Sequence, residues 1–262
     1  MNSESESETH SLNGIEMYCQ RRGDGEPLVL LHGFTGAGED WAHLFDLDEL
    51  ARRYQLIVPD LRGHGRSTNP GGLFSHRQCA LDVEALLDRL GLHRVRAIGL
   101  SLGGNTLLHL ATRQPARVSS MVLVSATMYY PPEARAIMRL MTEEGRSADE
   151  WSVMRARHRH GDGQIRALWK NARDFADDTE DLSFTPPRLA AITARTLIVY
   201  GDRDPLYPVE MALAMYRAIP GAALDVVAGG GHGPIFAGEQ KGAFVREALA
   251  FLEGEPAAEA LL

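Results

Sequence analysis

A serine lies between two glycines in the run Gly99-Leu100-Ser101-Leu102-Gly103, which follows the apolar stretch Val95 to Ile98 and precedes a helical pattern. In a strand–turn–helix context, this Gly-x-Ser-x-Gly pattern is typical of a sharp turn that lifts a serine hydroxyl above the end of a sheet. Glycines keep such a turn free of clashes, and the start of the following helix favours negative charge nearby. We therefore predict Ser101 as a nucleophile; the alternative is a glycine-rich connecting turn.

A serine hydroxyl is a weak nucleophile unless a base lies beside it. Of the ten histidines, His232 is distinguished by its loop, Gly229-Gly230-Gly231-His232-Gly233, which follows the last strand-like run. We predict His232 as the general base, the alternative being an ordinary histidine of a flexible loop.

A carboxylate must then hold the imidazole in one tautomer and stabilise its cation. Asp202 and Asp204 both follow the apolar run Thr196 to Tyr200. We predict Asp204 as the catalytic acid, because it lies further into the loop and nearer the expected cleft. Asp202 would instead cap the turn or pair with Arg203.

Two backbone amides are candidates for an oxyanion hole. Gly33 follows the apolar run Leu28 to Leu31 and lets the backbone turn close to a substrate, so that the Phe34 amide becomes one donor. The Leu102 amide, at the start of the helix after Ser101, is the second. Each such donor contributes roughly 3 kcal/mol to stabilising a tetrahedral oxyanion. The side chain of His32 is expected to be structural.

Short apolar runs alternate with longer amphipathic ones, which predicts a doubly wound, mostly parallel α/β sheet covered on both faces. We predict helices at about 41–53, 75–90 and 241–252, and a third that follows Ser101 and ends before Pro115. The runs predicted as strands are Leu28 to Leu31, Leu56 to Val58, Val95 to Ile98, Met121 to Val124, Thr196 to Tyr200 and Ala223 to Val227.

The alternation stops between Thr127 and Ala191, where the composition is helical and no strong strand run occurs. We predict a core of residues 12–126 and 192–253, an inserted helical cap of residues 127–191, and flexible tails at 1–11 and 254–262. The first tail begins with alternating Ser and Glu and has neither an apolar core nor a basic start, so we expect no signal peptide or membrane anchor there.

The 262 residues carry 27 basic and 35 acidic side chains, a net charge of -8. This balance argues against a nucleic acid or an anionic membrane as partner and favours a small-molecule substrate. No apolar run is long enough to span a bilayer. Cys19 and Cys79 lack metal-binding or redox spacing, which suits reduced thiols in a cytoplasmic protein.

The segments LVLLHGF, VPDLRGHGRS, GLSLGG, LIVYGDRDPLYP and GGGHG resemble the α/β-hydrolase superfamily in order and spacing, particularly its esterase, lactonase and C–C hydrolase branch. The resemblance covers about residues 12–253 apart from the insertion. It implies a Ser, Asp, His triad in that chain order, with the acid at Asp204 and Pro208 at the family's proline. It also implies structural roles for Asp60 and His64 and a substrate-covering role for the cap.

These features together predict a serine hydrolase that cleaves a small carboxylic ester through an acyl-enzyme intermediate, without metal or organic cofactor. The alternatives are a C–C bond hydrolase of a diketone, an enol-lactonase, and a cofactor-free perhydrolase or haloperoxidase-like enzyme. A non-catalytic ligand-binding protein is the alternative from another class.

Two features of the cap leave a choice. His158 and His160 flank Arg159 in a charged run; a metal site is conceivable, but a solvated helix face is the prediction. The large apolar cap residues either line an acyl pocket or pack the cap onto the core. These residues are Met138, Met141, Trp151, Met154, Trp169 and Phe175.

Overall fold

The computed structural model describes residues 6–236, 238 and 240–254. Its centre is an eight-stranded sheet of order β1-β2-β4-β3-β5-β6-β7-β8. The pairs formed among β3 to β8 are parallel, whereas β1 and β2 pair antiparallel to their neighbours. The strands are β1 (Glu6–Leu12), β2 (Ile15–Arg22), β3 (Glu26–Leu31), β4 (Tyr54–Pro59), β5 (Val95–Leu100), β6 (Val118–Val124), β7 (Arg195–Gly201) and β8 (Ala223–Val227). The predicted fold class, a mostly parallel α/β sheet, is confirmed.

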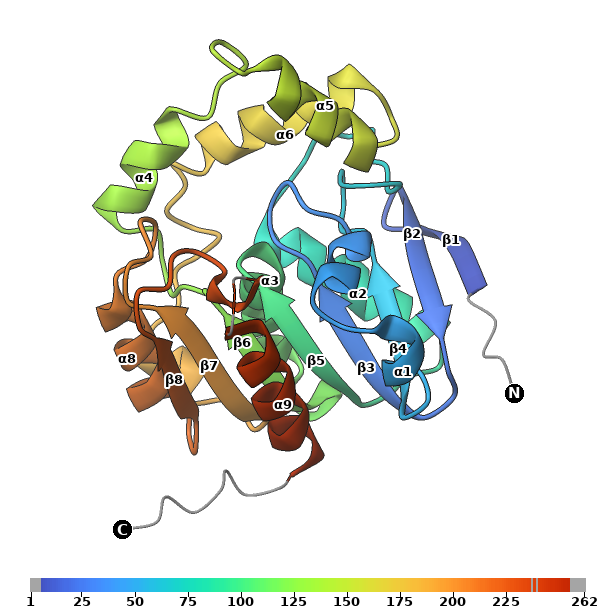
Figure 1. Cartoon of the computed structure of the whole chain (residues 1–262), viewed down its shortest axis with the longest axis vertical. Coiled ribbons are helices and arrows are strands. Elements are labelled where there is room, and N and C mark those ends of the chain that lie inside the picture. Colours follow the sequence, from blue (N-terminus) through green and yellow to red (C-terminus); the bar gives the residue numbers. More distant parts are fainter. Residues whose placement is uncertain (1–5, 237, 239, 255–262) are drawn as a thin grey trace.

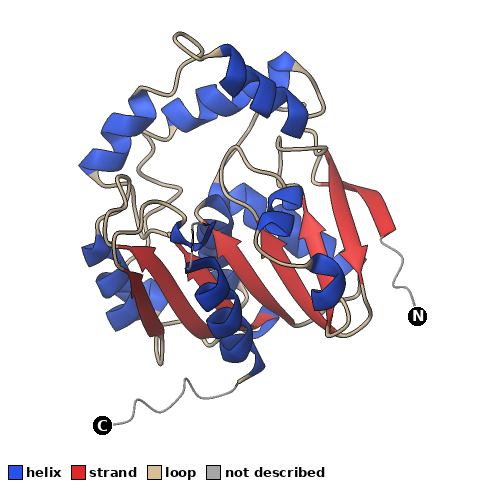
Figure 2. Ribbon diagram, viewed as in Figure 1, coloured by secondary structure: helices blue, strands red, loops and turns tan. Residues whose placement is uncertain are grey.

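Helices cover both faces of this sheet, as Figures 1 and 2 show. Successive side chains of a strand point to opposite faces: Val29 and Leu31 pack with α2, α3 and α8, while Leu28 and Leu30 pack with η1, α1 and α9. Both faces are therefore buried, which explains why these strands are continuously apolar. The helices of the core are η1 (Gly38–His43), α1 (Leu47–Leu50), α2 (His76–Arg89), α3 (Leu102–Arg113), η2 (Pro115–Arg117), α8 (Val209–Ala218), η3 (Pro234–Phe236) and α9 (Gln240–Glu253).

The amino-terminal part of the chain corrects one prediction. Residues 6–11 were expected in a flexible tail, but they belong to β1, which pairs along its whole length with β2. Strand β1 is a polar edge strand, and β2 beside it alternates buried residues with more exposed ones. Neither strand therefore has the continuous apolar run by which the inner strands are recognised. Residues 1–5 and 255–262 of the predicted tails lie outside the described residues.

The helix expected at about 41–53 is also wrong as a single element. Two short helices, η1 and α1, replace it. Asp46 separates them, because its side chain accepts hydrogen bonds from the amides of Asp48 and Glu49 and so starts a new helix. The apolar spacing nevertheless identifies a buried face, since Trp41, Phe45 and Leu50 all lie in the core.

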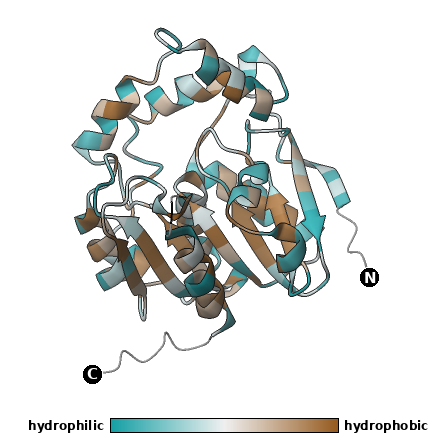
Figure 3. Cartoon of the chain, in the orientation of Figure 1, coloured by the Kyte–Doolittle hydropathy of each residue, from teal (hydrophilic) through white to brown (hydrophobic). Residues whose placement is uncertain are grey.

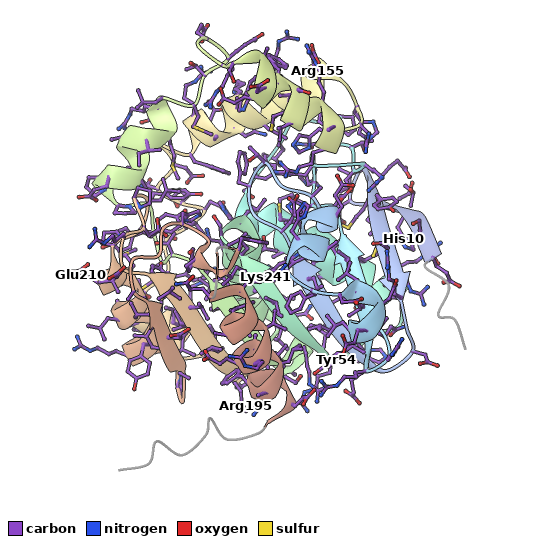
Figure 4. The ribbon with its side chains drawn as sticks, in the orientation of Figure 1. His10, Tyr54, Arg155, Arg195, Glu210 and Lys241 are labelled. Atoms are coloured by element: carbon purple, nitrogen blue, oxygen red, sulfur yellow. The ribbon has the colours of Figure 1, made fainter. Side chains whose placement is uncertain are left out.

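The segment between β6 and β7 contains four helices: α4 (Pro132–Arg139), α5 (Ala148–Arg157), α6 (Asp162–Asp174) and α7 (Pro186–Leu189). In Figure 1, α4, α5 and α6 arch over one end of the sheet. In Figure 4, Arg155 of α5 lies at the outer side of this arch, whereas Tyr54 and Arg195, which begin β4 and β7, lie at the opposite end of the molecule. The arch therefore covers the carboxyl ends of these strands.

Apolar residues are concentrated on the strands, while the arching helices are of mixed hydropathy (Figure 3). The cap has a small apolar cluster of its own, formed by Met154, Ile165, Leu168 and Trp169. Both cysteines are buried and unpaired. No helix within the described ranges has the length and apolar character that crossing a membrane requires.

Candidate active site

Ser101 lies in a tight turn between β5 and α3. Its backbone has φ +48° and ψ −106°, a conformation that a side chain rarely adopts without support from its surroundings. The Ser101 amide supplies part of that support by donating to the Val124 carbonyl over 2.8 Å. A Cβ on Gly103 would lie 2.1 Å from the Leu31 carbonyl oxygen, and one on Gly99 would lie 2.5 Å from the Gly103 carbonyl oxygen. Glycine at both positions is thus a steric requirement of the turn.

His232 and Asp204 form a direct pair. The histidine Nδ1 lies 2.8 Å from the Asp204 Oδ2, and the other carboxylate oxygen accepts from the Leu206 and Tyr207 amides at 2.8 and 3.2 Å. Because a carboxylate only accepts, this contact places the proton on Nδ1 and leaves Nε2 as the basic nitrogen. Asp202 is used elsewhere, since its Oδ1 accepts from the Gly229 amide at 2.6 Å.

The loop that carries His232 is tied to the ends of two inner strands. The Arg203 amide donates to the Gly230 carbonyl over 2.8 Å. The Gly233 amide donates to the Ser125 Oγ over 3.1 Å. Ser125 is fully buried at the end of β6 and, like Ser101, has φ +48°. The His232 loop is therefore fastened on both sides of the histidine to residues that follow β6 and β7.

Phe34 and Leu102, whose amides are predicted to form the oxyanion hole, follow the ends of β3 and β5. Both residues line the same cavity as Ser101 and His232. The Gly36 amide donates to the Gly33 carbonyl and closes the turn after β3. These strands are neighbours in the sheet, so both loops open at one edge of it. The oxyanion role of the two amides stays a prediction, and their shared place at this cavity is compatible with it.

Two buried histidines, His32 and His64, pack beside the turn that carries Phe34. His32 accepts from the Leu61 amide at Nε2, and its Nδ1 lies 2.8 Å from the Gly33 carbonyl oxygen, which agrees with a structural role. Burial lowers the pKa of His32, and burial together with the neighbouring His32 and His158 lowers that of His64 well below its ordinary value. Asp60 accepts from the Gly38 and Arg66 amides and fixes the adjoining loops.

The prediction that His158 lies on a solvated helix face is wrong. His158 is only 2 % exposed; its Nδ1 accepts from the Gly65 amide, and its Nε2 lies 3.1 Å from the Thr35 carbonyl oxygen. Burial lowers its pKa to about 4. The residue ends α5 and turns inward, which helical periodicity alone does not indicate. His158 thereby fastens the cap to the two core loops.

The cavity beside Ser101 lies under the cap and has a volume of about 270 Å³. The apolar cap residues divide between the two roles that the sequence leaves open. Met138, Met141 and Phe175 line the cavity, whereas Met154 and Trp169 are buried in the separate cap cluster with Trp151 packed against it. Some of these side chains therefore shape the pocket and others hold the cap together.

Sequence reasoning missed two polar residues next to Ser101. The Asn105 Oδ1 accepts from the Thr127 amide at 2.8 Å and so joins α3 to the start of the cap segment. Tyr207 lines the cavity and packs its ring edge-on to His232, with 5.3 Å between ring centroids. Burial and the nearby Asp204 raise the pKa of Tyr207, while hydrogen bonding with Asn105 and Ser101 opposes that rise. In the sequence, the place of Tyr207 directly before Pro208 is the one feature that could have indicated its position at the site.

Comparison with known proteins identifies a family match and more distant relatives. Residues 28–247 match the model of the family described as alpha/beta hydrolase. The chain is 29% identical over 239 residues to a dihydrolipoyllysine-residue acetyltransferase component of an acetoin-cleaving system from Cupriavidus necator, covering 84% of this chain but only 63% of that protein. It thus spans less than two thirds of that relative.

A second relative matches over more of its own length. The chain is 28% identical over 252 residues to 2-hydroxy-6-oxononadienedioate/2-hydroxy-6-oxononatrienedioate hydrolase 2 from Pseudomonas putida, covering 83% of this chain and 85% of that one. Among solved structures, an enol-lactonase from Burkholderia xenovorans superposes with a TM-score of 0.76 at 23% identity, over 94% of this chain and all of the other. That likeness concerns the fold.

Proposed function

The chain belongs to the α/β-hydrolase family, and from this premise we propose that it is a serine hydrolase of small carboxylic esters with the triad Ser101, His232 and Asp204. The observation that carries the proposal is the 2.8 Å contact between His232 Nδ1 and Asp204 Oδ2 beside a cavity that Ser101 also lines. In such a pair the imidazole is oriented to take a proton and its cation is stabilised.

The proposed mechanism has two steps. In the first, His232 Nε2 takes the Ser101 proton as the hydroxyl oxygen attacks the ester carbonyl, and the Phe34 and Leu102 amides bind the oxyanion. The tetrahedral intermediate collapses, His232 gives its proton to the leaving alcohol, and an acyl-serine remains. In the second, His232 takes a proton from water, the hydroxide attacks the acyl-serine, and the acid leaves as Ser101 regains its proton.

Hydrolysis of a C–C bond is the second candidate, and the match to the Pseudomonas putida hydrolase favours it. The substrates in that protein's name are dioates, which carry two carboxylates. No lysine or arginine occurs among the described residues that line the cavity, so the charge pattern suits a neutral ester better than a dianion. A panel of short esters, lactones and vinylogous diketone acids would rank the reactions by kcat/KM.

The triad is tested by Ser101→Ala, with Ser120→Ala, at a buried position within β6, as the serine control. We expect Ser101→Ala to lower kcat for p-nitrophenyl acetate and butanoate by about 10⁴-fold or more. A fluorophosphonate probe should label the wild-type protein at Ser101, which mass spectrometry of the tryptic peptide would locate. Unlabelled Ser101, or turnover retained in Ser101→Ala, would overturn the proposal; a protein that only binds ligands would give the first result.

A further inference from the structure

Two polar side chains that lie next to each other in the apolar wall of the cavity have no part in the proposed mechanism. These are His76, at the start of α2, and Tyr130, in the segment that leads into α4. The wall around them is formed by apolar cap residues such as Ile137, Met138 and Phe175. Polar groups placed singly in an apolar pocket commonly fix the orientation and the identity of a ligand.

His76 is held by a carboxylate from the cap. Asp181, between α6 and α7, accepts from the His76 and Arg77 backbone amides at 2.6 and 2.9 Å and pairs with the His76 Nδ1 at 2.6 Å. Burial raises the pKa of Asp181, but the hydrogen bond and charge of His76 together with the two amides outweigh it and bring the pKa to about 2. Asp181 is therefore an anion at neutral pH, seated at the amino end of a helix.

This contact directs the other ring nitrogen toward Tyr130. The Tyr130 hydroxyl lies 3.3 Å from the His76 Nε2. Burial, with smaller contributions from Tyr207 and Asp181, raises the pKa of Tyr130 well above its ordinary value, so the hydroxyl keeps its proton. A tyrosine hydroxyl has one donor and two acceptor positions, and His76 occupies one of them. No other hydrogen bond of this hydroxyl is found among the described residues, and Tyr130 lines the cavity.

We propose that Tyr130, oriented by His76 and Asp181, forms a polar subsite that binds a neutral hydroxyl group on the acyl part of the substrate. This inference rests on the proposed function and adds a substrate class to it: esters of hydroxylated short-chain acids. A hydroxyl fits because it both donates and accepts, and so pairs with Tyr130 whichever way the tyrosine proton points.

Charge distinguishes a hydroxyl from a carboxylate at this position. The Asp181 anion lies directly behind His76, and the cavity lining offers no lysine or arginine among the described residues. A carboxylate in this apolar pocket would lose its hydration without a lysine or arginine to compensate. A methyl group would fit sterically but would leave the tyrosine hydroxyl one hydrogen bond short.

The test compares esters that differ only in this group. The p-nitrophenyl esters of 3-hydroxybutanoate and 6-hydroxyhexanoate are set against their methyl isosteres, 3-methylbutanoate and heptanoate. We expect the wild-type protein to favour at least one hydroxylated ester by about three- to tenfold in kcat/KM, the effect of one net hydrogen bond. Tyr130→Phe should bring that ratio close to one, with little change for the isostere.

Tyr129→Phe is the matched control, because this neighbouring tyrosine is 48 % exposed and does not line the cavity. Tyr129→Phe should keep the wild-type ratio of kcat/KM between the hydroxylated esters and their methyl isosteres. Thermal melting of both variants checks that the cap is still folded. A wild-type ratio of one, or a ratio that Tyr130→Phe leaves unchanged, would overturn the subsite; equal losses for both esters would indicate a purely structural tyrosine and would overturn it as well.

Binding separates this inference from the proposed mechanism. Calorimetry with Ser101→Ala measures the affinity for the same four esters without turnover, and Ser101→Ala/Tyr130→Phe repeats the measurement without the hydroxyl. If wild-type protein cleaves none of the esters but Ser101→Ala still prefers a hydroxylated one, the mechanism fails and the subsite stands. If the esters are cleaved without that preference, the subsite fails and the mechanism stands.

Discussion

Two aspartate–histidine pairs approach one cavity, and they come from different parts of the fold. Asp204 and His232 lie on core loops after β7 and β8, with 2.8 Å between Oδ2 and Nδ1. Asp181 and His76 join the cap to the start of α2, with 2.6 Å between the same atoms. The pairs are chemically alike, so their roles must be set by their surroundings.

Exposure is the clearest difference between them. The His232 side chain is 25% exposed and its aspartate fully buried, whereas the His76 and Asp181 side chains are 3% and 4% exposed. A histidine that exchanges protons with substrate and water needs such access. His76 is instead shielded from solvent, and its Nε2 lies 3.3 Å from the Tyr130 hydroxyl. From this difference in exposure we propose that the core pair acts as the base and that the cap pair positions Tyr130.

The largest effect should come from neutralising the core pair. We expect Asp204→Asn to lower kcat for short p-nitrophenyl esters by about 10⁴-fold, because the amide favours the wrong histidine tautomer. Asp202→Asn is the control, since the Asp202 side chain accepts from the Gly229 amide and not from His232, and its kcat should stay within about threefold of wild type. If Asp204→Asn kept most of its activity while Asp202→Asn lost it, the two aspartates would exchange roles.

Neutralising the cap pair should instead reduce stability. Hydrogen bonds to a charged group contribute about 1.5–3 kcal/mol each, and the Asp181 carboxylate pairs with the His76 Nδ1 and two backbone amides. We therefore expect Asp181→Asn to lower the free energy of unfolding by about 3 kcal/mol, measured in urea. Asp177→Asn is the control, because that carboxylate is 82% exposed and pairs with Arg139 at the surface; it should change stability by less than about 1 kcal/mol. Equal stability of the two variants would show that Asp181 does not fasten the cap.

The smallest effect concerns His109, whose Nε2 lies 3.5 Å from Asp181. Burial lowers the pKa of His109 to about 4 from an ordinary 6.5, against the raising effect of Asp181, while His76 and Arg188 lower it further. Between pH 6.5 and about 4 the unfolded chain binds a proton that the folded chain does not. The free energy of unfolding therefore decreases as the pH falls through this range, and below it His109 causes no further decrease. The slope for one such histidine is at most ~1.4 kcal/mol per pH unit.

Urea unfolding at several pH values between these limits measures the slope. His109→Gln should reduce it, while His93→Gln, at an exposed position after α2, should leave it unchanged. An unchanged slope in His109→Gln would show that other groups govern the acid response.

Local sequence patterns identified the inner strands and the serine turn. Both depend on near neighbours: continuous apolar runs follow from burial on two faces, and Gly99 and Gly103 are required by atoms within the turn and on the adjoining strand. The contact between Asp204 and His232 was foreseeable as well, because parallel strands bring their following loops to one edge of the sheet. Strand β1 was not, since a polar edge strand has almost the composition of an exposed segment.

The second pair and the cap anchor depended on tertiary structure alone. His76 and Asp181 are 105 positions apart, and Asp181 lies in an irregular segment without periodicity. His158 sits in a charged run that predicts solvent exposure, yet it turns inward to accept from Gly65. Periodicity reports which face of an element is buried; it does not report which polar side chain finds a partner across the fold. That choice is made by the packing of the cap on the core, where a hydrogen bond offsets the cost of burying a polar group.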